Sequence, residues 1–132
     1  MCTSATEAGR ARIKGLGRRF LWISLGCAAF SLVYECFSHQ VYARRMVFAF
    51  LYPLLGGALP CLILPRLHRL PRAGALYAWR AGILTAMTGS LMCGALEIYG
   101  TTNRLTAAYP VLAALLCLGA LGDYLMHQAK TE

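Results

Sequence analysis

Four long runs of apolar residues, separated by short polar segments, dominate the chain. The runs cover residues 20–37, 46–64, 78–99 and 107–126. A helix needs about 20 mainly apolar residues to cross the hydrocarbon core of a bilayer, and each run is close to that length. The short connections predict that helices adjacent in sequence pack as antiparallel hairpins. We therefore predict an all-α membrane protein with four transmembrane helices arranged as two hairpins.

Polar segments flank these runs. Residues 1–19 are expected to form a basic cytoplasmic tail, partly helical on the membrane surface, followed by a transmembrane domain over 20–126 and a second tail over 127–132. The first run resembles the hydrophobic part of a signal peptide, but no cleavage site closes it, so we expect it to be retained as a span. Composition supports membrane insertion, because 58% of the residues are hydrophobic and 14% are charged, against roughly a quarter charged in soluble domains.

The basic residues predict the orientation. The formal charge is +8, and cytoplasmic loops of membrane proteins carry an excess of Lys and Arg. Ten basic residues fall on the side of the two termini, and three fall on the other side: Arg44, Arg45 and Arg104. This asymmetry predicts that both termini are cytoplasmic, in the inner or plasma membrane of a bacterial cell. It also accounts for the positive charge without nucleic acid, although the basic N-terminal segment is suited to contact anionic lipid head groups.

Helix-breaking residues interrupt the second run, at Pro53, Gly56, Gly57 and Pro60. Proline removes a backbone hydrogen bond and kinks a helix. Membrane helices tolerate this where a neighbouring helix or a hydrated cavity satisfies the freed groups. A broken span marks the binding site of some transporters, but here we favour a kink that only shapes the packing.

A stripe of small side chains predicts a contact face on the third run. Gly82, Ala86, Ser90 and Gly94 recur at every fourth position. Small residues at this spacing allow another helix to approach closely. The stripe does not say whether that helix belongs to the same chain or to a second one.

Two glutamates, Glu35 and Glu97, lie within the first and third runs. Counted from Phe20 and from Gly82 at 1.5 Å per residue, each is roughly 22 Å along its run, so both are expected near the outer end of the membrane. Helical spacing places Glu97 on the small-residue face and Glu35 on a small, polar stripe with Ser24 and Ser31. Both side chains are therefore predicted to face protein.

Two interpretations of these glutamates stay open. In the structural one they pair with outer basic residues and join the helices. In the functional one they line a polar site that handles a proton or a cation, because buried acids with raised pKa values commonly couple transport to protons. The candidate polar site comprises Glu35, His39, Glu97 and Arg104.

Sequence motifs give no support for catalysis. The chain has no nucleophile elbow, phosphate loop or zinc-protease motif, and its six cysteines form no CxxC pair. We therefore predict no catalytic residues, no metal and no cofactor. The expected partners are the lipid bilayer and either a second copy of this chain or another membrane protein.

Two stretches carry a family resemblance. They are Val33–Glu35 with Phe37–His39 leading into Tyr52–Gly57, and Leu96–Thr101. They resemble small, uncharacterised bacterial four-helix membrane proteins, and the resemblance implies the fold and no activity. The first two runs are also similar to a putative ABC-transporter membrane family. Length and span count are similar to small multidrug resistance transporters, whose essential glutamate lies mid-membrane, unlike Glu35.

These observations lead to one prediction and one alternative for function. We predict a small multi-pass membrane protein that acts as a homo-oligomer or as an accessory subunit of a membrane complex, which includes transport complexes. The alternative is a small transporter or channel for a proton, a cation or a cationic solute that uses Glu35 and Glu97.

Overall fold

The computed structural model describes residues 2–37, 43–66 and 70–130, and every regular element in them is helical. The long helices are α1 (Cys2–Phe37), α4 (Ala73–Ile98) and α5 (Ala108–Ala129). A short 3₁₀ turn, η4 (Arg104–Ala107), precedes α5. Between α1 and α4 lies a helical segment of changing pitch, residues 44–66, which we call span two.

Four segments are long and apolar enough to cross a membrane: Thr6–Phe37, Arg44–Arg66, Ala73–Ile98 and Arg104–Ala129. The prediction of an all-helical protein with four candidate spans is thus confirmed. The first helix begins earlier than the apolar run. The basic segment before the run is also helical, so α1 is continuous from Cys2. At 1.5 Å per residue, α1 is about 54 Å long, so it extends well beyond a hydrocarbon core of about 30 Å.

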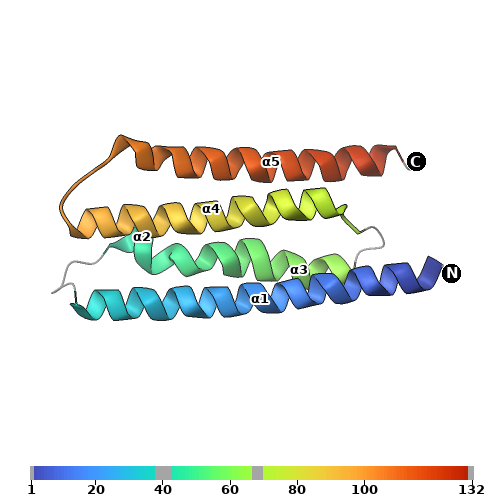
Figure 1. The fold of residues 1–132 in the computed structure, drawn as a ribbon, viewed down its shortest axis with the longest axis horizontal. Helices are drawn as coiled ribbons and strands as arrows, with labels where there is room; N and C mark the ends of the chain where they lie inside the picture. The colour runs from blue at the N-terminus through green and yellow to red at the C-terminus, as the bar shows by residue number, and fades with distance from the viewer. Residues whose placement is uncertain (1, 38–42, 67–69, 131–132) are drawn as a thin grey trace.

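The helices lie side by side in a row, in the order α1, span two, α4, α5 (Figure 1). Among the described residues, the backbone of α5 packs along α4 and not against α1 or span two. The backbones of α1 and α4 are likewise separated by span two. The N-terminal end of α1 and the C-terminal end of α5 lie on the same side of the molecule, which we call the terminal side (Figure 1).

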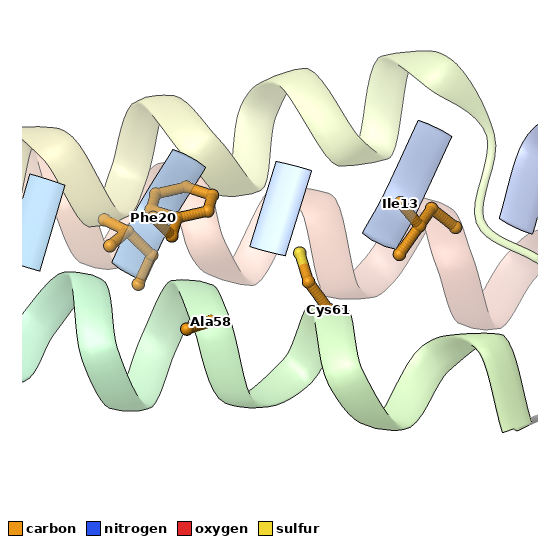
Figure 2. Packing of buried hydrophobic residues seen from close by; sticks show 5 residues of the cluster. Ile13, Phe20, Ala58 and Cys61 are labelled. Carbon is orange, nitrogen blue, oxygen red and sulfur yellow. The ribbon is translucent and has the colours of Figure 1, made fainter. Parts of the chain in front are cut away.

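One face of α1 packs against span two. Its buried positions alternate by three and four residues, as in a helix with one contact stripe: Ile13, Gly17, Phe20, Ser24, Cys27 and Ser31. Figure 2 shows Ile13 and Phe20 above the segment that carries Ala58 and Cys61. Ile83 of α4 completes this core from the other side.

The pitch of span two changes along its length. It begins with α2 (Arg44–Val47) and the 3₁₀ turn η1 (Phe48–Phe50), continues as the π-helix η2 (Tyr52–Ala58), and ends with α3 (Leu59–Ile63) and the 3₁₀ turn η3 (Leu64–Arg66). Pro53, Gly56 and Gly57 lie inside the π-helical part, and Pro60 lies shortly after it. The prolines and glycines that were predicted to kink this span therefore coincide with a change of its hydrogen bonding from the α to the π register. The absence of a side chain at Gly57 also lets α1 approach, since a Cβ there would lie 2.4 Å from the Phe20 ring.

The small-residue stripe of α4 is used within the chain at both of its ends. A Cβ on Gly82 would lie 2.6 Å from Cys117 Sγ of α5. A Cβ on Gly94 would lie 2.5 Å from the Met46 Cβ of span two and 3.1 Å from the Met46 backbone. Glycine at these two positions therefore permits α4 to pack closely against two different neighbours.

Candidate functional site

Side chains from α1 donate hydrogen bonds to the backbone of span two. Ser24 Oγ donates to the Phe50 carbonyl over 2.9 Å, and Ser31 Oγ donates to the Met46 carbonyl over 3.0 Å. Both serines are 4% exposed, which places these bonds in the interior. The accepting carbonyls lie in the first half of span two, where α, 3₁₀ and π turns succeed one another.

Side chains from α4 donate to the same segment from the opposite side. Ser90 Oγ donates to the Arg45 carbonyl over 2.6 Å, and Trp79 Nε1 donates to the Gly56 carbonyl over 2.7 Å. Span two thus receives donors from both helices that flank it. An unsatisfied carbonyl in hydrocarbon costs several kcal/mol, so these side chains permit an irregular backbone at membrane depth.

The bond from Trp79 has a specific cause in the sequence. In an α-helix, the carbonyl of Gly56 accepts from the N–H group of residue 60. Residue 60 is proline, which has no N–H group. The Gly56 carbonyl therefore has no α-type bond in this π-helical part, and the indole of Trp79 donates to it from the neighbouring helix.

An ion pair lies at the side of the molecule opposite the terminal side. Arg45 Nε of span two is 3.3 Å from Glu97 Oε1 of α4, and the two side chains are 64% and 40% exposed. The pair is close to the Ser90 bond, so three side chains connect α4 to the beginning of span two. Beside it, Tyr34 near the end of α1 lies close enough to interact with Tyr99, the residue that follows α4.

Glu97 is positioned by the way α4 ends. Gly100 has a φ angle of 72°, and the Thr101 and Gly100 amides donate to the carbonyls of Leu96 and Glu97. This pair of bonds is the Schellman arrangement, which needs a left-handed residue that glycine adopts without strain. These bonds end α4 directly after the turn that carries Glu97, and the ion pair with Arg45 joins this last turn to span two.

An open groove extends inward from the ion pair. Its floor is α4, through Ile83, Ala86, Ser90 and Cys93. One wall is span two, with Tyr52 and Leu55, and the other is α5, with small side chains and a proline: Pro110, Ala113, Ala114 and Cys117. The part bounded by α5 encloses about 550 Å³. Its lining is apolar except for Arg45, Tyr52 and Ser90, with the thiols of Cys93 and Cys117.

The residues of the predicted polar site have different places in the structure. Glu97 pairs with Arg45, whereas Arg104 is exposed at the beginning of η4. Glu35 is half-buried on α1, which span two separates from the helix of Glu97. His39 lies outside the described residues.

Sequence reasoning missed several residues of this arrangement. Trp79 has the position of an interfacial aromatic residue, and the sequence predicted no partner for its indole. The available signal was Pro60, because a proline inside a span implies that one carbonyl needs a hydrogen-bond donor from another segment. Tyr52 gave no signal beyond its position one residue before Pro53.

The chain matches no protein-family model, no curated protein and no solved structure. The resemblance to small bacterial four-helix membrane proteins therefore stays a prediction.

Proposed function

We propose that this protein is a subunit of a homo-oligomeric membrane assembly in which the groove on α4 receives a helix of a second copy. The open groove carries the proposal. Three helices bound it, small side chains line its floor and one wall, and no segment of the described chain fills it. Small residues are the usual means by which membrane helices approach closely.

Helix α5 of the second copy is the proposed occupant. It is the least buried of the four candidate spans, since only 11% of its most apolar stretch is buried within the chain. Its outward face presents Val111, Leu115 and Leu118 at a spacing of four and three residues, which forms one apolar ridge. Exchange of this ridge between two copies would give a closed, two-fold dimer.

The membrane topology is part of the same proposal. We place the chain in a bacterial inner membrane as two antiparallel hairpins with both termini cytoplasmic. The distribution of basic residues supports this orientation. The N-terminal end of α1 and the C-terminal end of α5 also lie on the same side of the molecule, as an arrangement of two hairpins requires (Figure 1).

Filling the groove tests the dimer. Ala86→Leu with Ala114→Leu adds bulk to the groove floor and one wall, where the structure leaves space. We expect the dimer fraction in nanodiscs, measured by single-molecule photobleaching and by native mass spectrometry, to fall at least tenfold while the helical content is unchanged. The matched control is Ala29→Leu, which lies exposed on the face of α1 away from span two and should leave the dimer intact. Unmodified protein that is monomeric at all densities would contradict the proposal.

Transport is the second candidate, because polar side chains follow the groove inward from the membrane surface. Arg45, Tyr52 and Ser90 give a proton or a small cation a partly polar route beside Glu97. If this candidate is correct, reconstituted vesicles show proton or cation flux that Glu35→Gln combined with Glu97→Gln abolishes. Flux unchanged by the double substitution would exclude it, and we expect the subunit interpretation to hold because Arg45 already neutralises Glu97.

A further inference from the structure

Two arginines contact the same tyrosine on the terminal side of the molecule. Arg12 Nη2 of α1 donates to the Tyr77 hydroxyl of α4 over 3.1 Å. The Arg80 guanidinium carbon is 5.7 Å from the centre of the same Tyr77 ring. A single tyrosine thus holds two cations from different helices close together. Within the described part of the chain, neither arginine forms an ion pair with a carboxylate.

A pocket lies beside this pair. It encloses about 130 Å³, roughly the volume of four molecules of liquid water. Arg12 and Arg80 supply its charged wall, and Ile13, Leu16 and Leu76 supply an apolar wall. Charged groups on one side and apolar side chains on the other suit the two parts of a lipid, its phosphate and its acyl chains.

The first turn of α4 adds a further group of donors. Pro71 and Ala73 line the pocket, and α4 begins at Ala73. The N-cap residue, Arg72, makes no side-chain capping bond. The first amides of a helix have no acceptor within it, and they favour an anion through their N–H groups and the helix dipole.

The depth of the pocket agrees with the level of lipid phosphates. Arg80 is eighteen residues before Ile98, the last residue of α4, which is about 27 Å along the helix. That distance is close to the thickness of the hydrocarbon core. If the Glu97 end lies at one membrane surface, Arg80 therefore lies at the other.

We propose that this pocket binds the phosphate group of an anionic glycerophospholipid, held by Arg12, Arg80 and the first amides of α4. Tyr77 positions both guanidinium groups, and the apolar wall receives the upper part of an acyl chain. The inference requires that the chain spans a membrane, and it is independent of the proposed dimer. Cationic residues near an anionic leaflet attract its lipids, and charge-assisted hydrogen bonds to phosphate add specificity.

Native mass spectrometry of the full chain with added lipid tests the site. We compare phosphatidylglycerol with phosphatidylcholine, for the unmodified protein and for Arg12→Gln with Arg80→Gln. We expect at least tenfold tighter retention of phosphatidylglycerol by the unmodified protein, and a loss of at least tenfold in the variant. The matched control is Arg19→Gln with Arg66→Gln, which removes the same charge from exposed residues that do not line the pocket. The control should change retention by less than threefold.

Three outcomes would overturn the proposal. One is equal retention of the two lipids, and another is an equal loss in the control, which would indicate diffuse surface charge. The third is displacement of the lipid by millimolar inorganic phosphate, which would indicate a site for free anions. Tyr77→Phe keeps both charges but removes the hydroxyl, so it should weaken retention by a smaller factor than the double variant. It thereby gives a test in a protein whose charge is unchanged.

Discussion

Replacing Gly94 with valine should separate α4 from span two. A Cβ at this position would lie 2.5 Å from the Met46 Cβ and 3.1 Å from the Met46 Cα and N atoms, so the backbone must move. That movement would also break the Ser90 bond to the Arg45 carbonyl and the Arg45–Glu97 ion pair. We expect the free energy of unfolding, measured by SDS titration in mixed micelles, to fall by at least about 3 kcal/mol, since overpacking alone commonly costs about 1–3 kcal/mol.

A valine elsewhere in the same membrane protein provides the control. Gly26 of α1 is exposed, and a Cβ added there would have no atom of a neighbouring segment within 4 Å. Gly26→Val should therefore change the free energy of unfolding by no more than about 0.5 kcal/mol. Equal losses for the two valine variants would mean that the close approach of α4 to Met46 does not stabilise the fold.

The hydrophobic pattern was sufficient to predict the four candidate spans. Long apolar runs have few structural solutions in a bilayer, because only helices and closed barrels satisfy their backbone there. It did not predict the full extent of α1, which begins at Cys2. The basic positions before Phe20 are compatible with a tail or with a helix, and the contact of Ile13 with span two selects the helix.

The candidate site was predicted in part. Glycine and proline in the second run predicted an irregular helix, and the structure has a π-helix there. The donors from Ser24, Ser31 and Trp79 were not predicted, because the identity of the unsatisfied carbonyls depends on where the register changes. Arg45 was one of several basic residues within reach of Glu97. The rotation of span two about its axis selects Arg45, and one sequence does not specify that rotation.

The hydrogen bond from Trp79 to the Gly56 carbonyl is expected to make the second large contribution to the free energy of unfolding. Removing a donor from a buried carbonyl costs about 1–3 kcal/mol, and side-chain hydrogen bonds measured in membrane proteins reach about 1.7 kcal/mol. We expect Trp79→Phe to lower the free energy of unfolding by about 1–2 kcal/mol. Part of this loss is the smaller ring, so the single variant does not isolate the hydrogen bond.

A double-mutant cycle with Pro60→Ala isolates the hydrogen bond from Trp79. It tests most directly whether neighbouring side chains satisfy the backbone carbonyls of span two. Alanine restores an N–H group at residue 60, which pairs with the Gly56 carbonyl when this part of span two takes the α register in place of the π register. We predict that Trp79→Phe costs about 1 kcal/mol less in the Pro60→Ala background than in the unmodified protein. An equal cost in both backgrounds would contradict this role of Trp79, because it would show that the side chain stabilises the protein by packing alone.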